Sequence, residues 1–541
     1  MLAHHLATAG VPVHLCDANL ATLEQLLSPG ALEDAARQLG ERGAPPAALT
    51  SAARCARRAP GALEALRGGD AYSRGRDYRA AADTVLEGLR AVSRARGIRL
   101  TLSDLALPGL SPLAGGDLLR AYREPTLSGL ATELTRVAHR LLAWDPALVG
   151  ISATYLSQAL PAAALAGLLR AAGYRGRIVL GGGVVTSWLG RLQPDSVLFT
   201  VWDALVAGPG EDALRTLATG GDPAHAPGLL APGRSIWNPP RGRDRVATGS
   251  RPRLDGLPWE HYLAPGPILP VATSRGCYWR RCTYCPETAQ DRQAFRPTRA
   301  GELAEEILHA RDTYGIRHLH LTDDAIPPGT LRRLAGLLRD QGVSWYGFVR
   351  PEPALRDPAL AAELARGGCA MLQLGIESAS QGVLDRLGKG VRAADAAPIL
   401  ANLAGAGIRT YVYLLYGVPG ESAADREATT AWAAEHGAHI GFLNLALMNV
   451  PHQAAPTGAA DSTRELSLYA GLEPGDPFDR HSARRALTTA RAHPDLREIL
   501  RRTPPGFGAN HAAWVPLERK GKPKDALLNF RTPTPSRLPP P

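Results

Sequence analysis

Three cysteines within nine residues, Cys277, Cys282 and Cys285, have the residue type and spacing of a metal centre. They follow an apolar stretch, and the residues around them make a turn-rich, cationic loop. Such a setting lowers the pKa of a thiol and favours thiolate ligands. Thiolates hold iron-sulfur clusters and zinc, but structural zinc usually takes four protein ligands in two pairs, and the chain has no second cysteine pair. Three ligands leave one metal position open.

Two other interpretations of these cysteines stay open. A structural zinc site could be completed by a histidine such as His261 or His318, or the thiols could hold no metal. Disulfides fit worst, because the other cysteines are scattered singly (Cys16, Cys55 and Cys369) and no signal peptide precedes them. We therefore expect a cytoplasmic protein with free thiols.

After the cysteines, strand-like apolar runs alternate with segments of helical period. With the strand that ends at Thr273, six strands precede residue 452; the other five are IRHLHLTDD, VSWYGFVRP, CAMLQLGIES, IRTYVYLLYGVPGE and HIGFLNLALMNVP. The alternation indicates βαβ units and a parallel sheet. At roughly 30 residues per unit, it predicts a partial (β/α)6 barrel of the TIM type rather than a full eight-unit barrel.

The segment VATSRGCYWRRCTYCPE resembles the cluster-binding loop of radical S-adenosylmethionine (radical SAM) enzymes. In those enzymes three cysteines bind a 4Fe-4S cluster, and the open iron binds the methionine end of SAM. They usually have three residues between the first two cysteines, whereas this chain has four. The closing pair has the family form, with Tyr284 before the last cysteine. The resemblance implies that Cys277, Cys282 and Cys285 are the catalytic cluster ligands and that Tyr284 lies at the cofactor.

The same resemblance assigns roles to polar residues at the strand ends, where ligands gather in parallel sheets. Asp323 and the aspartate after it match a short acidic motif that receives the methionine amino group. Glu377 and Ser378 match the position that hydrogen-bonds the ribose hydroxyls. Gly417 and Gly420 match a glycine-rich turn that lets the backbone approach the cofactor closely.

The first 240 residues predict a second α/β domain. A strand from Leu148 is followed by a helix that buries one face (Leu160, Ala164, Leu165 and Leu168) and by a strand ending in three glycines. The segment LVAGPGEDAL adds another strand and glycine turn. Such cycles are typical of a Rossmann-like, doubly wound binding domain. A purely structural layer is the alternative.

The strings ISATYLSQ, LGGGVVT and GPGE resemble the cobalamin (vitamin B12)-binding domain that precedes the barrel in one radical SAM subclass. By that resemblance, Thr154, Tyr155 and Gln158 line the corrin, and a set of glycines admits its nucleotide tail: Gly181, Gly182, Gly183, Gly208 and Gly210. The Asp-x-His-x-x-Gly signature of a histidine-ligated cobalt is absent. We also expect the first strand of the domain to be missing, because the chain begins within a helix-like stretch.

These patterns predict five segments: a Rossmann-like domain over 1–240, a linker over 241–268, the barrel over 269–452, a mixed or helical segment over 453–519 and a disordered tail over 520–541. The segment SARRALTTARAH predicts a helix that covers the barrel mouth. The longest apolar run, Leu160 to Leu169, is far shorter than the roughly 20 residues of a membrane span, so no membrane partner is expected.

The formal net charge of +10 does not by itself predict a nucleic-acid partner. Four of the 61 basic residues are lysines and 57 are arginines, spread along the whole chain, which is typical of a GC-rich genome rather than of a basic patch. Three of the four lysines lie in the last 22 residues; the fourth is Lys389.

The function implied by the resemblance is reductive cleavage of SAM by the cluster, followed by hydrogen abstraction from an unactivated carbon and methyl transfer from methylcobalamin. We expect a methyltransferase acting on a small-molecule natural product or a peptide, with an electron donor such as flavodoxin or ferredoxin. The alternatives are a ring-forming or rearranging enzyme without methyl transfer and, from another class, a zinc-stabilised binding protein. RNA modification is disfavoured, because only Cys16 and Cys55 precede the barrel.

Overall fold

The computed structural model describes residues 2–189, 191–193, 195–232, 254, 256–285, 295–452, 465–470 and 480–511. The chain forms two compact units. The N-terminal unit comprises Met1–Glu64, Ala81–Tyr262 and Ser462–Leu468, and the barrel unit comprises Ala65–Ala80, Leu263–Asp461 and Tyr469–Pro541. This division differs from the predicted boundaries at 65–80 and 462–468. The predicted tail and half of the predicted linker lie outside the described residues.

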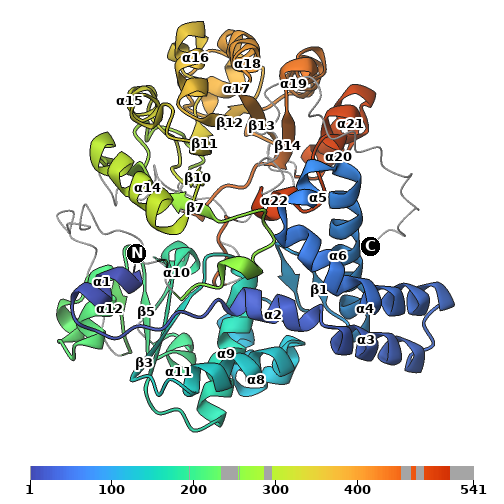
Figure 1. Ribbon diagram of the computed structural model, residues 1–541, viewed down its shortest axis with the longest axis vertical. Coiled ribbons are helices and arrows are strands. Elements are labelled where there is room, and N and C mark those ends of the chain that lie inside the picture. The colour runs from blue at the N-terminus through green and yellow to red at the C-terminus, as the bar shows by residue number, and fades with distance from the viewer. Residues whose placement is uncertain are drawn as a thin grey trace. The chain divides into compact units, whose positions relative to one another are not determined.

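The barrel unit is built on a six-stranded parallel sheet, and all six predicted strands are present (Figure 1). Its order is β14-β13-β12-β11-β10-β7, so each strand pairs with its neighbour in the chain. The strands are β7 (Ile268–Val271), β10 (His318–Leu321), β11 (Ser344–Val349), β12 (Cys369–Glu377), β13 (Arg409–Tyr416) and β14 (Phe442–Leu447). A two-stranded antiparallel pair, β8 (Ser274–Arg275) and β9 (Arg296–Pro297), follows β7.

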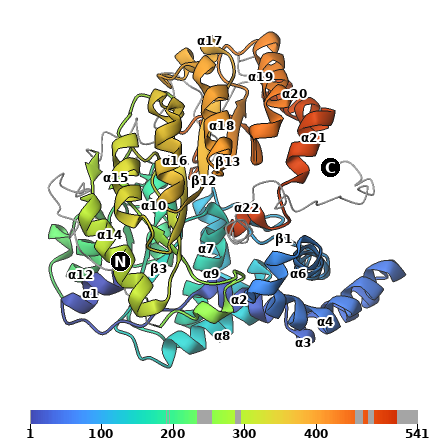
Figure 2. The same cartoon turned by 45° about the horizontal axis from the view of Figure 1, so that its top comes forward.

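Helices connect successive strands of this sheet and lie along its outer side, as Figures 1 and 2 show. Neighbouring helices pack against each other, α14 on α15, α15 on α16 and α16 on α18. Their bounds are α14 (Ala300–Tyr314), α15 (Pro328–Leu338), α16 (Pro358–Arg366), α17 (Gln381–Arg386), α18 (Ala396–Gly405) and α19 (Ala423–Glu435). This right-handed βα alternation brings the carboxyl ends of all six strands to one edge.

The C-terminal helices are α20 (Arg480–Ala492), α21 (Pro494–Arg501) and α22 (Phe507–Asn510), and α20 confirms the predicted helix. The Arg502 guanidinium donates to the carbonyls of Gly437 and Ile440, which precede β14. The ring of Phe507 lies 4.3 Å from that of Phe442, the first residue of β14. The end of this segment therefore packs near the amino end of β14, where Phe507 is fully buried, whereas the first turn of α20 lies beside Gly417, directly after β13. That the segment covers the mouth stays a prediction.

The chain before Ala147 is almost entirely helical, which the prediction of a Rossmann-like domain over 1–240 missed. Side-chain caps start α2 and α3, since Asp17 and Ser28 accept hydrogen bonds from backbone amides of the first turn. A minimal antiparallel pair, β1 (Arg99–Leu100) and β2 (Leu105–Ala106), interrupts the helices. The helices are α1 (Leu2–Thr8), α2 (Ala18–Leu26), α3 (Pro29–Glu41), α4 (Pro46–Arg67), α5 (Gly69–Ser73), α6 (Gly75–Arg96), α7 (Gly115–Arg123) and α8 (Ala131–Leu142).

The α/β part of the N-terminal unit begins at the predicted strand, β3 (Leu148–Ser152), which pairs in parallel with β4 (Arg177–Gly181); β4 pairs in parallel with β5 (Ala204–Val206). The antiparallel β6 (Leu229–Leu230) completes the order β3-β4-β5-β6. Among the described strands the order runs in one direction, without the reversal that marks a doubly wound sheet. No parallel strand precedes β3 in the described part of the chain.

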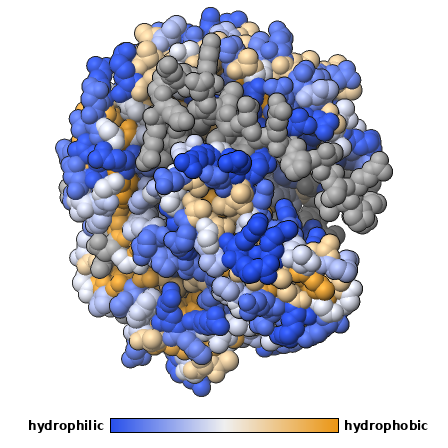
Figure 3. Space-filling view, turned by 45° about the vertical axis from the view of Figure 1, so that its right-hand side comes forward, coloured by the Kyte–Doolittle hydropathy of each residue, from blue (hydrophilic) through white to orange (hydrophobic). Residues whose placement is uncertain are grey.

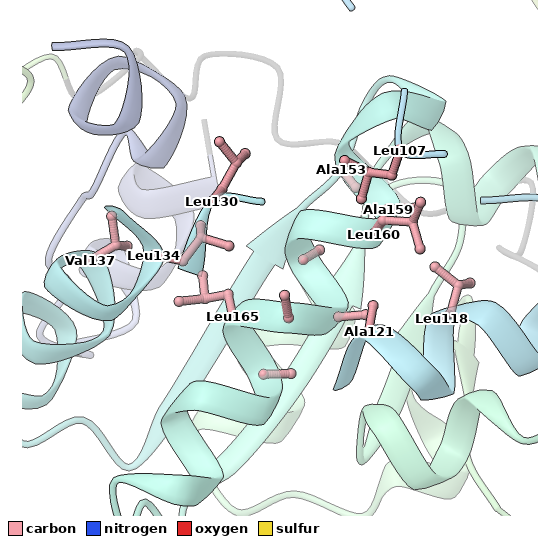
Figure 4. Packing of buried hydrophobic residues seen from close by; sticks show 14 of the residues in the cluster. Leu107, Leu118, Ala121, Leu130, Leu134, Val137, Ala153, Ala159, Leu160 and Leu165 are labelled. Carbon is pink, nitrogen blue, oxygen red and sulfur yellow. The ribbon is translucent and has the colours of Figure 1, made fainter. Parts of the chain in front are cut away.

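The connection between β3 and β4 is α9 (Ala159–Ala171), which packs against α7 and α8. Figure 4 shows Leu160 and Leu165 of α9 among side chains of both neighbours. Leu160, Ala164 and Leu165 are buried as predicted, but Leu168 is only half-buried and Leu169 is fully buried instead. Apolar residues surround α9 on most sides, so its position is fixed by packing.

No helix in the described part of the chain is both long and apolar enough to cross a membrane. The face drawn in Figure 3 mixes hydrophilic and hydrophobic residues over the described surface.

Candidate active site

The three cysteines lie on one loop beyond the carboxyl end of β7. Gly276 turns the chain into the loop with a φ of +69°. Cys277, Cys282 and Cys285 are half-buried, and the Cys285 amide donates to the Cys282 carbonyl at 3.2 Å. All six cysteines of the chain are free thiols, as expected.

The donor set fits a thiolate-held cluster in type, with three half-buried thiols on one loop beside two buried cations, Lys389 and Arg350. Among the described residues, no group of three or more His, Cys, Asp or Glu side chains is arranged to hold a metal ion. The ligand role of the three cysteines therefore stays a prediction.

The charge environment of the loop differs from the expected one. Burial raises the pKa of the Cys282 thiol, and the positive charges of Lys389 and Arg350 offset this only in part. For Cys282, burial therefore outweighs the lowering of the thiol pKa by nearby cations. Arg281, the residue before Cys282, is exposed and lies over the Trp279 ring. The positive charges that act on the Cys282 thiol therefore come from other segments, through Lys389 and Arg350.

Asp323, at the end of β10, is buried and holds the start of the cysteine loop. Its carboxylate accepts hydrogen bonds from the Thr273 amide at 2.8 Å, the Thr273 hydroxyl at 2.9 Å and the Ser274 hydroxyl at 2.6 Å. Since three donors satisfy this charge, we assign Asp323 to loop anchoring. The neighbouring Asp324 is exposed, and desolvation by its surroundings and the charge of Asp323 raise the pKa of its carboxyl. Of the predicted acidic pair, Asp324 is the residue that can meet a ligand.

Glu377, at the end of β12, is buried and has a φ of +65°, an uncommon conformation for a residue other than glycine. Its Oε1 accepts from the ammonium of Lys389 at 2.7 Å and from the hydroxyl of Tyr284 at 3.1 Å. Burial and the charge of Glu377 raise the pKa of Tyr284, so the phenol stays a neutral donor. The structure thus brings Tyr284 and Glu377 together, as a shared site requires.

Ser378 does not join this group. It is fully buried, its hydroxyl lies 2.9 Å from that of Thr429, and it also accepts from the Ser380 amide at 3.1 Å. These bonds hold the turn after β12 onto α19. The predicted contact of Ser378 with a ribose is therefore not supported by its position.

The glycine turn after β13 is present, and both glycines have positive φ, +83° at Gly417 and +69° at Gly420. The Gly417 amide donates to Glu421 at 2.7 Å. A Cβ at Gly417 would lie 2.6 Å from the Ala483 side chain of α20. Glycine at position 417 thus allows α20 to pack closely. A Cβ at Gly420 would make only ordinary contacts, so the positive φ explains the glycine there.

Two cations at this edge, Arg350 and Lys389, lie at positions that the sequence did not predict. Lys389 stood out in the sequence only as the one lysine far from the C-terminus. Arg350, directly after β11, is buried; its Nη2 donates to the Lys389 carbonyl at 2.6 Å and its guanidinium lies 4.1 Å from the Trp279 ring centre. Its Nε donates to Glu352, which also accepts from the Tyr278 hydroxyl at 2.8 Å. Arg350 therefore links the cysteine loop to the loops after β11 and α17.

In the N-terminal unit, the predicted residues lie together at the carboxyl edge of β3, β4 and β5. Thr154 and Tyr155 follow β3 and are exposed, Tyr155 by 67%. The side chain of Gln158 accepts from both of their amides, at 2.7 and 2.9 Å, so its oxygen shapes the turn. Thr154 and Tyr155 remain available to a ligand.

The glycines after β4 approach the protein's own backbone. Gly182 has a φ of +99°, and a Cβ there would lie 2.5 Å from the Ala153 carbonyl oxygen. Cβ atoms at Gly181 and Gly183 would lie 3.3 Å from backbone oxygens of Val206 and Thr154. The glycines at 181–183 are thus explained by the close packing of the turns after β3, β4 and β5, and room for a nucleotide tail is not needed to explain them.

Thr186, which sequence reasoning did not single out, ties the glycine turns together. Its hydroxyl donates to the Gly182 carbonyl at 3.1 Å and accepts from the Gly208 amide at 2.9 Å. Gly208 has a φ of +75°, whereas a Cβ at Gly210 would make only ordinary contacts from 3.6 Å. The result is a rigid, backbone-lined edge beside an exposed aromatic ring, and these residues fit a large flat ligand such as a corrin.

Residues 271–433 match the sequence model of the Radical SAM superfamily. Among curated proteins, the chain is 28% identical to an uncharacterized methyltransferase of Pyrococcus horikoshii over 57% of this chain and 68% of that protein. It is also 28% identical to the cytidylyl-2-hydroxyethylphosphonate methyltransferase of Streptomyces wedmorensis, over 42% of each chain.

Two kinds of solved structure are similar at lower identity. The radical SAM methyltransferase TsrM of Kitasatospora setae, with cobalamin and a 4Fe-4S cluster bound, has 21% identity and a TM-score of 0.48 over 64% of this chain and 74% of that one. The cobalamin-dependent radical SAM enzyme OxsB has 18% identity and a TM-score of 0.44 over 56% of this chain and 45% of that one.

The family match covers the cysteine loop and the strands that carry Asp323, Glu377 and Gly417. It confirms the resemblance on which these residues were singled out, and with it the assignment of SAM as a cofactor of the barrel. The barrel unit thus contains a radical SAM domain over residues 271–433.

Proposed function

We propose that this enzyme is a cobalamin-dependent radical SAM methyltransferase that methylates an unactivated carbon of a small natural product or a peptide. The observation that carries the proposal is the position of the cysteine loop, at the carboxyl edge of a six-stranded parallel sheet whose sequence matches the Radical SAM superfamily. Methyl transfer is supported by the two curated relatives, both of which are named methyltransferases.

When bound, a 4Fe-4S cluster and SAM supply the radical that removes a hydrogen atom, and cobalamin supplies the methyl group. The residues of the chain bind and orient these groups. Asp324 presents an exposed carboxylate for an ammonium group, while Asp323 fixes the loop that carries the thiols. Glu377 directs Oε1 to Lys389 and Tyr284, which leaves Oε2 for ribose hydroxyls.

The N-terminal unit contributes the corrin face in this proposal. Tyr155 offers an exposed ring, and the glycine turns joined by Thr186 offer a backbone surface that flat ligands can approach. An external reductant such as flavodoxin or ferredoxin would supply the electron.

The test needs no knowledge of the final substrate. The protein is reconstituted anaerobically with iron, sulfide and hydroxocobalamin, freed of unbound ligand, reduced, and given SAM that carries a deuterated methyl group. We expect about four irons per chain, a retained corrin, and mass-spectrometric appearance of the deuterated methyl group on the corrin.

Each failure has a distinct meaning. A retained corrin that never receives the label would replace the methyltransferase proposal with a ring-forming or rearranging enzyme. A protein that cleaves SAM but retains no corrin would make the N-terminal unit a structural layer. One tightly held zinc and no iron would overturn the whole proposal in favour of a zinc-stabilised binding protein.

A further inference from the structure

The loop after α17, residues 386–390 with the sequence RLGKG, is the surface on which the cysteine loop lies; we call it the support loop. The Thr283 amide donates to the Leu387 carbonyl at 2.9 Å, and the Trp279 indole donates to the Gly388 carbonyl at 2.8 Å. These bonds join the support loop to the stretch between the first two cysteines and to the stretch before the third.

Two glycines of the support loop are required by this close approach. Gly388 and Gly390 have φ values of +61° and +64°. A Cβ at Gly388 would overlap the Arg281 carbonyl oxygen, and a Cβ at Gly390 would overlap the Trp279 ring. The four residues between Cys277 and Cys282 therefore pack closely against the support loop, which is possible because Gly388 and Gly390 have no side chain.

Between these glycines stands Lys389, whose side chain is 8% exposed. Its ammonium lies 2.7 Å from Glu377 Oε1 and 3.3 Å from the Tyr284 hydroxyl, and its backbone carbonyl accepts from Arg350. Lys389 thus touches the cysteine loop through Tyr284 and the end of β12 through Glu377. A buried ammonium needs such partners, because an unpaired buried charge is strongly destabilising.

Lysine at this position runs against the composition of the chain, in which arginines outnumber lysines 57 to 4. Gly375 shows why a compact cation is needed: a Cβ there would lie 2.6 Å from Glu377 Oε1 and 2.9 Å from Lys389 Nζ. The guanidinium of arginine is wider and planar, so we expect it not to bind one carboxylate oxygen and the phenol together beside Gly375.

We propose that Lys389 is a positioning residue that sets the distance between the cysteine loop and the ribose acceptor by holding Tyr284 and Glu377 on one ammonium. The inference rests on the proposed function in one respect, that SAM binds at this edge. Lys389 acts through Glu377 and not through contact with SAM. Its loss therefore weakens SAM binding only while Glu377 carries a charge.

The experiment is a double-mutant cycle on the reconstituted enzyme, with SAM affinity measured by anaerobic equilibrium dialysis and iron measured separately. Lys389→Met is expected to weaken SAM binding about ten-fold, the scale of a lost charge-assisted hydrogen bond, and Lys389→Arg is expected not to restore it. In a Glu377→Gln background, Lys389→Met should change SAM affinity by less than about two-fold. Arg392→Met, which removes an exposed cation three residues away, serves as the control and should leave affinity unchanged.

A second variant covers the case in which Lys389→Met fails to fold. Gly375→Ala keeps both charges but displaces them, so it should weaken SAM binding while iron content stays at the level of the parent. Parent-like affinity in Lys389→Met or in Gly375→Ala, restoration by arginine, or an equal loss in the Glu377→Gln background would each overturn the inference. If the fully iron-loaded parent binds no SAM, the proposed function itself has failed.

Discussion

The two candidate cofactor edges, one in each unit, are built from opposite kinds of residue. At the barrel edge, buried charges hold the loops: Asp323 anchors the cysteine loop, and Lys389 pairs with Glu377. At the edge of β3, β4 and β5, Thr186 and glycine backbone hold the loops, and the side chain that faces outward is Tyr155. A buried charge that loses its partner strongly destabilises a fold, whereas a glycine turn is destabilised by an added side chain that strains the backbone or clashes with its neighbours. At the barrel edge, removing a charged group should therefore lower stability most. At the edge of β3, β4 and β5, adding a side chain to a glycine should lower stability most.

The largest loss of stability should follow Asp323→Ala. Removing a carboxylate that accepts three hydrogen bonds leaves buried donors unpaired and should cost at least about 3 kcal/mol of unfolding free energy, measured by urea denaturation of the iron-free protein. The matched control is Asp324→Ala, which removes an exposed carboxylate and should change stability by less than about 0.5 kcal/mol while weakening SAM binding. Equal losses in the two variants would contradict the division of roles between the two aspartates.

Next in size is a pH effect at two histidines that contact Tyr346 of β11. His320 stacks on Tyr346 at 4.3 Å and His511 meets the same ring edge-on. Burial lowers the pKa of both imidazoles to about 4. Since the unfolded chain binds these protons near pH 6.5, their contribution is complete above that pH and is lost as the pH falls towards 4, by roughly 2 to 3 kcal/mol each.

Urea unfolding between pH 8 and pH 4 checks this effect. His511→Asn keeps a residue that tolerates the φ of +55° and removes one titrating group, so its stability should fall less steeply below pH 6.5 than that of the parent. The exposed His225→Asn is the control and should follow the parent. Identical slopes for the parent and His511→Asn would show that His511 does not titrate with folding.

Gly182→Ala should have a smaller effect and should act through the fold. With a φ of +99° and the Ala153 oxygen at 2.5 Å from the added Cβ, the variant should lose about 1 to 3 kcal/mol of stability. Gly210→Ala has a negative φ and contacts no closer than 3.6 Å, so it should be nearly neutral. Thermal unfolding followed by circular dichroism distinguishes the two. A neutral Gly182→Ala would contradict the packing explanation and restore room for a nucleotide tail as the reason for this glycine.

The smallest effect on stability is expected for Tyr155→Ala, because the ring is 67% exposed and its removal should change unfolding free energy by less than about 0.5 kcal/mol. Corrin retained after reconstitution with hydroxocobalamin should nevertheless fall several-fold if the ring lines the corrin. Tyr314→Ala, another exposed aromatic, should retain as much corrin as the parent. Full retention by Tyr155→Ala would move the corrin face away from this ring.

Local patterns in the sequence were enough to predict the six barrel strands, the glycine turns and the helix within 480–492, because alternation, turn residues and helical period are short-range signals. The contacts that Asp323, Ser378 and Gly182 make could not be predicted, because each depends on a partner far away in the chain, Thr273, Thr429 and Ala153. The packing of α22 near the amino end of β14 could not be predicted for the same reason.

Lys389 is an intermediate case. Its rarity was visible in the sequence, but its pairing with Glu377 and Tyr284 depends on how the loop after α17 meets the cysteine loop, which no local pattern encodes. The helical segment before Ala147 was missed because motif resemblance, strongest after Leu148, was extended over the whole N-terminal domain.

The central claim is that the loop of Cys277, Cys282 and Cys285 holds the cluster that cleaves SAM, and deoxyadenosine formation under a strong reductant measures this most directly. Each of the three alanine variants should lose iron and form no deoxyadenosine, because a cluster held by two thiolates is poorly retained. Alanine at Cys16, Cys55 or Cys369 should leave cleavage intact, since these thiols lie outside the loop. Parent-like deoxyadenosine formation by any of the three loop variants would contradict the account.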